Sequence, residues 1–415
     1  MDAAEPDARR VRAARAGILV LFVGMGLMLG THVSRVPSVR DALGVTLAQL
    51  GALFIAGSIG GLIAFSLLGG LVARLGSLLL LRLASVAVVV GFGGMALAAH
   101  LGSPAVFGAA MFVTLGSFET VNALANAEAA TVERMAGRSI MSQFHAAFAL
   151  ALLAGVGIGA LYSGAGVAVP VHYLVNVGVV GLAFLACARL AILDGAPAAA
   201  DSEERAGGIF VTLRVAARER RTLALGLIIF CAFTIEMSAN NWLPLTLVDD
   251  FGRTEALAAL LYAALVVAQS AVRVVGGRLI DRLGRVRILR GSAVLVAAGV
   301  LLIALAPGFW AVPLALLLWG AGAALGYPLA ISAAADERTN ATARVAAVAA
   351  FGTIAGLTMP QAIGLLAEGL GLRLSLLLVV AVAGAMLLLA PAARPLPAPA
   401  TGVEEGEGAA DTLEA

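Results

Sequence analysis

The sequence predicts an all-α membrane protein in which twelve transmembrane helices form two pseudo-symmetric six-helix bundles. Of its 415 residues, 61% are hydrophobic and 13% are charged, whereas a soluble domain has about 45–50% apolar and about 25% charged residues. Residues 42–73, 139–188 and 291–335 contain no ionised side chain. Because about 20 apolar residues cross a bilayer, the longer runs must each hold two helices.

A repeated loop indicates that the two bundles arose by duplication. Residues 69–76 read GGLVARLG and residues 277–285 read GRLIDRLGR, which places Arg74 and Arg282 208 positions apart. The same offset relates three further pairs, namely Asp41 and Asp249, Gly44 and Gly252, and Arg82 and Arg290. We therefore expect two copies of one six-helix unit.

Hydropathy places the helices in chain order. We expect them at about 16–34, 47–73, 79–100, 104–128, 139–163, 168–192, 223–247, 255–280, 288–306, 310–334, 345–367 and 373–392. The domains are then an N-terminal half (1–193), a polar cytoplasmic linker (194–222), a C-terminal half (223–392) and a cytoplasmic tail (393–415). The tail is rich in Pro and Ala and then in acidic residues, which predicts disorder.

The arginines predict the orientation of the chain. All 27 basic residues are arginine, and 22 of them lie in the N-terminus, the even-numbered loops, the linker and the C-terminus. Since cytoplasmic segments carry the excess of positive charge, both termini are expected in the cytoplasm. The net charge of +2 does not suggest a nucleic-acid partner. Cys187 and Cys231 fall inside predicted helices, so no disulfide framework is indicated.

The second copy of the loop carries an acidic residue and several basic ones. Its members are Gly277, Asp281, Arg282, Gly284 and Arg285. This segment resembles the Gly-x-Leu-x-Asp-Arg-x-Gly-Arg loop of the major facilitator superfamily, which implies a gating role, although the loop could equally serve only insertion and packing. The first copy has Ala73 at the aspartate position and Ser77 at the following basic position. We therefore expect the two halves to be unequal, with the contacts that close the cytoplasmic side concentrated in the second half.

Three further segments are similar to YbjJ-type inner-membrane proteins, which are relatives of the fucose permeases. They are residues 35–41 (RVPSVRD), 238–244 (SANNWLP) and 319–328 (WGAGAALGYP). Residues 116–120 (GSFET) are similar to the Gly-x-x-Glu-Thr segment in which fucose permeases carry a proton-binding carboxylate. The resemblance implies a bacterial cytoplasmic (inner) membrane, transport by alternating access, and a proton-binding role for Glu119. It does not imply fucose as the substrate, because His32 and Val33 stand where fucose permeases have an aspartate.

Polar residues at membrane depth are the candidates for binding solute or protons, since a charge there costs about 2.5–3.5 kcal/mol or more. Glu119, Asn122 and Asn126 share one face of a helix. A stripe of this polarity is expected to face a cavity. The alternative is a neutral glutamic acid that hydrogen-bonds between helices.

The second half offers a similar set. Glu236 lies near the middle of its helix, with Asn240 and Asn241 nearer the outer end. Trp242 is expected to be an interfacial anchor. Arg273 is intramembrane, below Gln269 on the same face; it is expected either to neutralise a glutamate or bind an anionic substrate, or to support the Asp281 loop and its movements.

Five more side chains are weaker candidates for the same site. They are Gln143, His145, Trp319, Tyr327 and Gln361. A histidine in a wet cavity can carry protons, and Trp319 with Tyr327 can stack on a sugar or aromatic ligand. For these aromatic residues, helix packing is the competing interpretation. Tyr327 is also the repeat partner of Glu119, because the two positions differ by the 208-residue offset.

The function expected from these features is secondary active transport of a small polar or amphipathic solute, coupled to protons. The alternatives are a proton-driven exporter of drugs or natural products, a sensor with a transporter fold, and a membrane-embedded enzyme. Because no metal cluster, triad or nucleotide loop is present in the sequence, we expect no enzyme activity, cofactor, metal or nucleotide partner. The expected partners are the solute, protons and the lipid bilayer, with the protein as a monomer.

Overall fold

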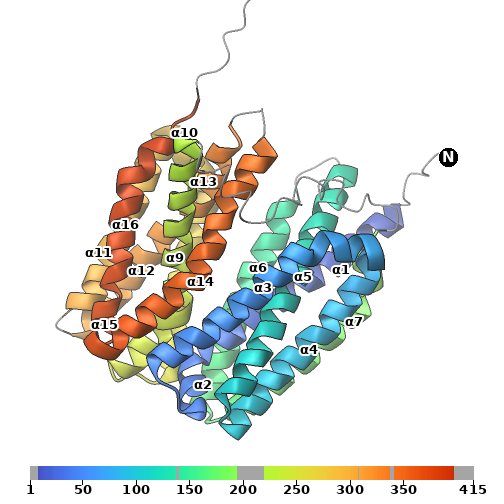
Figure 1. Ribbon diagram of the computed structural model, residues 1–415, viewed down its shortest axis with the longest axis horizontal. Helices are drawn as coiled ribbons and strands as arrows, with labels where there is room; N and C mark the ends of the chain where they lie inside the picture. The colour runs from blue at the N-terminus through green and yellow to red at the C-terminus, as the bar shows by residue number, and fades with distance from the viewer. Residues whose placement is uncertain (1–7, 137–139, 194–218, 307, 337–340, 397–415) are drawn as a thin grey trace, which may run out of the picture.

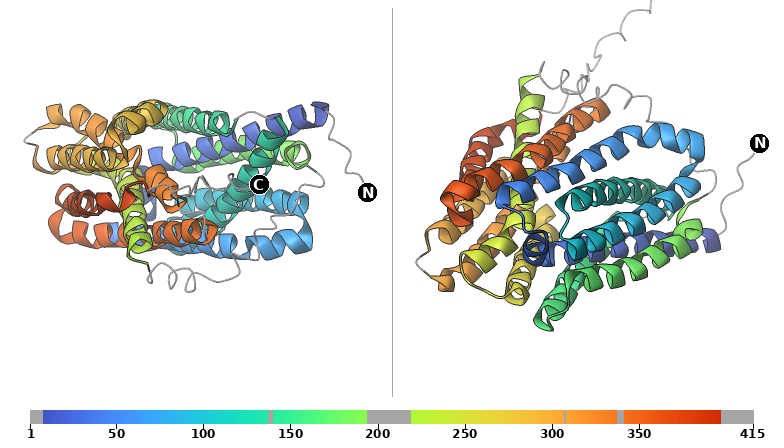
Figure 2. Two further views of the ribbon diagram at one scale, coloured as in Figure 1. Left: turned by 90° about the horizontal axis from the view of Figure 1, so that it is seen from above. Right: turned by 60° about the horizontal axis from the view of Figure 1, so that its bottom comes forward.

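The chain folds into two groups of helices that lie side by side (Figure 1), as seen in a computed structural model. The structure describes residues 8–136, 140–193, 219–306, 308–336 and 341–396. Within this part of the chain, twelve helical segments are long and apolar enough to cross a bilayer. The predicted all-α fold with twelve spans is therefore confirmed. The further views in Figure 2 keep the two groups on opposite sides of the molecule.

The first group (blue to green in Figure 1) holds seven helices in its described residues. These are α1 (Ala8–Ser34), α2 (Val36–Leu43), α3 (Leu47–Leu75), α4 (Ser77–Leu101), α5 (Pro104–Ala136), α6 (Met141–Gly164) and α7 (Val169–Ala191). The short α2 was not predicted from the sequence. It has Pro37 in its first turn and ends at Gly44 in the left-handed conformation, which are ordinary start and stop signals.

Two spans are longer than hydropathy predicted. α1 begins at Ala8 and α5 continues to Ala136, because a helix with charged residues such as Arg12 or Glu133 can extend beyond the hydrocarbon. A 33-residue helix such as α5 is about 50 Å long, which exceeds the bilayer core of about 30 Å. Hydropathy marks where the hydrocarbon ends and does not mark where the helix ends.

The second group (yellow-green to red) is built from α9 onward. It contains α9 (Arg220–Asp249), α10 (Glu255–Leu283), α11 (Arg285–Leu305), η3 (Phe309–Ala311), α12 (Val312–Ala323), α13 (Gly326–Ala334), α14 (Ala341–Leu370), α15 (Leu372–Ser375), α16 (Leu377–Leu389) and η4 (Ala390–Ala393). The single helix expected over 310–334 is interrupted between α12 and α13. Most of the predicted linker and tail, residues 194–218 and 397–415, lies outside the described residues.

The two ends of the bundle are distinguished by the chain termini. Arg10 near the start of α1 donates to the carbonyl of Leu190 at the end of α7, and Arg221 at the start of α9 donates to the carbonyl of Ala392 in η4. We call this the terminal end. The opposite end, which carries α2 and α15 (Figure 1), is the loop end.

The duplication is visible in the backbone. Gly76 and Gly284, the repeat partners that end α3 and α10, have φ/ψ of 75°/156° and 79°/153°. Gly44 and Gly252, also 208 positions apart, have φ of 62° and 61°. These φ values favour glycine, so the repeat preserves the same turn at the same place in both halves.

Candidate functional site

The polar stripe of the first half is a chain of hydrogen bonds along α5. Asn126 Nδ2 donates to Asn122 Oδ1 at 2.9 Å, and Asn122 Nδ2 donates to Glu119 Oε2 at 3.5 Å. All three side chains are half-buried. A Cβ on Gly61 of α3 would lie 3.2 Å from Glu119 Cγ, so this glycine makes room for the glutamate. Among the described residues, Glu119 has an amide donor but no ion-pair partner.

The second half presents a carboxylate that is paired. Glu236 Oε1 on α9 accepts from Gln269 Nε2 at 3.2 Å and from an Arg273 Nη atom at 3.4 Å, both on α10. The side chains of Glu236 and Arg273 are 31% and 45% exposed. The sequence left open whether Arg273 pairs with a glutamate or supports the Asp281 loop. In the structure its guanidinium lies beside Glu236. The Asp281 loop lies two turns further along α10.

Side chains of both halves lie in the neighbourhood of these carboxylates. Tyr327 on α13 is near enough to Glu119 and Glu236, and His145 on α6 to Arg273, for their charges to act through space, although no hydrogen bond or ion pair joins these pairs among the described residues. We call these eight residues the central cluster; its members are Glu119, Asn122, Asn126, His145, Glu236, Gln269, Arg273 and Tyr327. These side chains keep part of their surface exposed, except for the buried Gln269.

Three predicted site residues make their contacts outside this cluster. Trp319 is fully buried and donates from Nε1 to the Ile235 carbonyl at 3.3 Å, so it packs α12 onto α9. Asn240 is buried and its Oδ1 accepts from the Tyr262 hydroxyl at 2.7 Å. Gln143 lies near the terminal end, where its Oε1 accepts from Arg15 at 2.6 Å.

The seam between α3 of the first half and α9 and α14 of the second contains two other candidates. Trp242 is fully buried with its ring edge-on to Phe54 of α3 at 5.9 Å, so the expected interfacial position is wrong. A Cβ on Gly51 would lie 3.1 Å from the Cα of Gln361, whose Oε1 is buried and has no hydrogen-bond partner among the residues that the structure describes. Asn241, beside Trp242, is half-buried.

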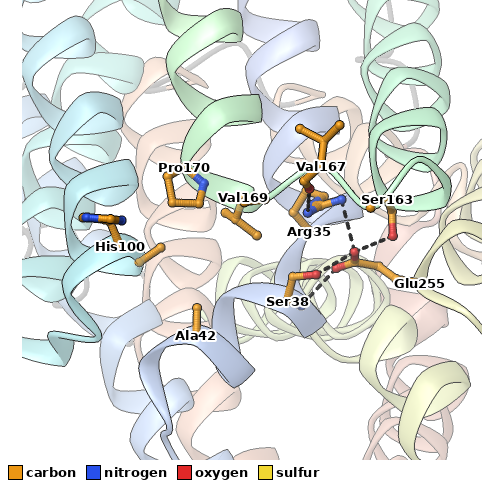
Figure 3. A pocket seen from close by; sticks show the side chains of 12 residues that line it. Arg35, Ser38, Ala42, His100, Ser163, Val167, Val169, Pro170 and Glu255 are labelled. Carbon is orange, nitrogen blue, oxygen red and sulfur yellow. Dashed lines mark hydrogen bonds and ion pairs between the residues drawn. The ribbon is translucent and has the colours of Figure 1, made fainter.

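The loop end is closed by polar contacts between the halves (Figure 3). Glu255, the first residue of α10, accepts from the Ser38 backbone N at 2.9 Å and from the Ser38 and Ser163 hydroxyls, each at 2.6 Å. An Arg35 Nη atom lies 3.3 Å from the same carboxylate, and both side chains are largely buried. Arg40 also pairs with Asp249 across the halves. We call the contacts of Glu255 the loop-end latch.

At the terminal end, the described ion pairs stay within the second half. Asp336, just after α13, accepts two bonds from Arg285 Nη1 at 2.8 and 2.7 Å and one from Arg221 at 3.1 Å. Glu219 before α9 accepts from Arg344 at 2.7 Å. The Arg344 guanidinium, followed by the Thr222 hydroxyl, lowers the pKa of Glu219 to about 2.

The predicted loop motif is only partly engaged in this arrangement. Arg285 is held by Asp336, and Gly284 forms the turn, whereas Asp281, Arg282 and Gly277 are exposed. Asp281 makes no ion pair within the described part of the chain. The acidic centre here is therefore Asp336 and not Asp281.

Sequence reasoning missed Glu255 and Asp336. Glu255 is the first residue of a span and Asp336 follows another by two residues, and an acidic side chain is ordinary at either position. The available signal was Glu255 directly after the capping residue Thr254, but an acid there is explained by the helix dipole alone. In the described residues, no group of three or more His, Cys, Asp or Glu side chains could hold a metal ion, and both cysteines are buried and free.

Comparisons with known proteins show similarity to transporters over most of the chain. Residues 225–413 match the family model of the Major Facilitator Superfamily. The chain is 30% identical over 361 residues to the "uncharacterized transporter y4wD" of Sinorhizobium fredii, which covers 87% of this chain and 93% of that protein. It is 27% identical over 353 residues to an "uncharacterized MFS-type transporter" of Yersinia pestis, covering 84% and 88%.

Solved structures share the fold at low identity. The nucleoside transporter NupG superposes with a TM-score of 0.69 at 14% identity, covering 92% of this chain and 98% of that one. A D-xylose-proton symporter gives 0.71 at 14% over 92% and 98%. The fucose:proton symporter of E. coli gives 0.59 at 17% over 91% and 98%. With this fold and these relatives, the chain belongs to the major facilitator superfamily.

Proposed function

We propose that the protein is a secondary active transporter that moves a small polar or amphipathic solute by alternating access, coupled to protons. The observation that carries this proposal is Glu119. It lies in the middle third of α5 without an ion-pair partner among the described residues, and its charge acts through space on Tyr327 of the other half. An ionised carboxylate at this depth costs about 2.5–3.5 kcal/mol or more, and a proton removes that cost.

The central cluster is suited to a solute that touches both halves. α5 and α6 supply Glu119, the asparagines and His145, while α9, α10 and α13 supply Glu236, Arg273 and Tyr327. A ligand that bridges the two sets can favour one relative position of the halves over another, which is what alternating access requires.

The orientation follows from the arginines. The terminal end carries the arginine-rich segments, so it is the cytoplasmic end in a bacterial inner membrane. The latch at the loop end then closes the external side, and the partly exposed Arg273 and Glu236 would be reached from the cytoplasm. This arrangement corresponds to an inward-facing state of a monomer embedded in lipid.

The test is transport by purified protein in proteoliposomes. Because the similar structures are named for nucleoside, D-xylose and fucose, the first radiolabelled probes are uridine, D-xylose and L-fucose. A thermal-shift screen of sugars, amines and natural products extends the set, since a ligand of the folded state raises its melting temperature.

We expect an imposed proton gradient to drive accumulation of at least one probe, and Glu119→Gln to abolish that accumulation while leaving the protein folded. Asp41→Asn is the matched control, because its carboxylate is exposed at the loop end. Accumulation that ignores the gradient, or that survives Glu119→Gln, would contradict proton coupling at Glu119.

A further inference from the structure

The break in the tenth spanning segment leaves one backbone carbonyl without a helical donor. α12 ends at Ala323 and α13 begins at Gly326. Pro328, in the first turn of α13, has no N–H, so the carbonyl four residues earlier, on Ala324, cannot receive the usual helical bond. Arg273 Nε donates to that carbonyl at 3.2 Å. A side chain of α10 thus replaces the missing bond.

The same guanidinium also holds the carboxylate of the second half. While Nε bonds to Ala324, an Nη atom lies 3.4 Å from Glu236 Oε1. Arg273 therefore joins α9, α10 and the α12–α13 break through one planar group, in which the donors have a fixed relation to each other.

The two sides of the break are packed against different neighbours. A Cβ on Gly320 of α12 would lie 2.2 Å from the Leu265 carbonyl oxygen of α10, and one on Gly326 would lie 3.0 Å from Ala232 Cβ of α9. α12 is thus fixed to α10 and α13 to α9. The angle between them is set at the break, where Arg273 bonds.

α13 connects the central cluster to the terminal end. Tyr327 lies in its first turn, and Asp336, which holds Arg221 and Arg285, follows its last residue by two positions. A nine-residue helix spans about 13 Å. Any change in the direction of α13 moves the tyrosine and the Asp336 ion pairs together.

We propose that Arg273 is a positioning residue that links the occupancy of Glu236, by a solute or a proton, to the geometry of the α12–α13 break. It thereby determines the positions of Tyr327 and Asp336. When a solute or a proton occupies Glu236, the guanidinium loses its anionic partner and its hold on the Ala324 carbonyl changes. This inference rests on the proposed function only in taking Glu236 and Tyr327 as groups that meet the solute.

The competing explanation is that Arg273 only neutralises Glu236. The two explanations differ at Pro328. In Pro328→Ala the backbone regains an N–H that can bond to the Ala324 carbonyl within the helix, so the positioning role of Arg273 becomes redundant, whereas its charge pairing with Glu236 does not.

The experiment follows the reactivity of a cysteine at position 327 toward a membrane-impermeant maleimide. The full chain carries Tyr327→Cys together with Cys187→Ala and Cys231→Ala, both native cysteines being buried, and is labelled in inside-out vesicles. We expect Arg273→Met to speed labelling on the order of tenfold, the factor associated with one hydrogen bond from a charged donor. Adding Pro328→Ala should bring the rate back to within about twofold of the parent.

Arg278→Met is the matched control on α10, because Arg278 is exposed and bonds to no residue in the described part of the chain; its rate should equal that of the parent. If Pro328→Ala fails to reduce the effect of Arg273→Met, the positioning role is wrong.

Arg273→Lys is a second test of the proposal. The lysine keeps the positive charge, but its single nitrogen cannot bond to Glu236 and to the Ala324 carbonyl as the guanidinium does, so labelling should again be faster. A rate equal to that of the parent overturns the proposal. Neither readout uses a solute, so these outcomes are independent of the transport assay.

Discussion

Glu255→Gln is expected to open the loop end. The substitution keeps the size of the side chain but removes the charge that faces Arg35, whose side chain is 4% exposed against 11% for Glu255. The carboxylate also accepts three hydrogen bonds from Ser38 and Ser163. Removing one partner of a buried ion pair costs about 3–5 kcal/mol. The cost falls on the closed arrangement, because the seam is hydrated when the halves separate.

A cost of about 3 kcal/mol shifts the ratio of open to closed molecules by about 100-fold. The assay is pulsed electron paramagnetic resonance between spin labels at Leu101 and Leu305, which are exposed and terminate α4 and α11 at the loop end of different halves. We expect a longer distance to appear in Glu255→Gln.

Asp249→Asn provides the comparison for this prediction. It breaks a second ion pair between the halves, in which Arg40 binds Asp249, whose side chain is 26% exposed. Such a partly exposed pair is worth about 0–1 kcal/mol. An unchanged distance distribution in Glu255→Gln, or a larger change in Asp249→Asn, would refute the assignment of the latch to Glu255.

Two further predictions concern the terminal end. Asp336→Asn should lower the melting temperature by several degrees, because it leaves Arg285 and Arg221 without their shared anion, whereas the exposed Asp281→Asn should shift it by no more than about 1 °C. Glu219 has a folded-state pKa near 2, below its unfolded value of about 4.3. Its contribution to stability is therefore complete above about pH 4.3 and disappears as the pH falls toward 2, so Glu219→Gln should flatten acid unfolding in that window; an unchanged acid profile would contradict this.

The spans were predictable because the bilayer imposes a local rule. Each of the twelve segments has to form its own backbone hydrogen bonds and expose apolar side chains to lipid, so hydropathy alone located them. The repeat was also local: Gly76 and Gly284 end equivalent helices with nearly the same φ and ψ. The stripe of Glu119, Asn122 and Asn126 depended only on helical periodicity.

Contacts between distant segments were not predictable in the same way. Arg35 and Glu255 form an ion pair between the two halves. The residue pattern within either segment does not predict that the other segment is its partner. Trp242 was misplaced for a related reason: a tryptophan near a helix end is ordinarily interfacial, but this end of α9 is covered by Phe54 of α3. The break at Pro328 had a local signal in the proline itself, yet the residue that compensates it, Arg273, lies 51 positions before Ala324, whose carbonyl it binds.

The charges of the central cluster limit what one transport cycle can carry. Glu119 and Glu236 supply two negative charges and Arg273 one positive charge, so with neutral His145 the ionised cluster has one negative charge in excess. Because an uncompensated charge at this depth is costly, one proton should accompany a neutral solute, whereas a monovalent cationic solute should take the place of that proton. Currents from proteoliposomes on a solid support measure the difference: a neutral probe such as D-xylose should move one positive charge per molecule, in the same direction as itself. Movement of two charges, or of none, would mean that a second group of the cluster titrates during the cycle or that Glu119 does not.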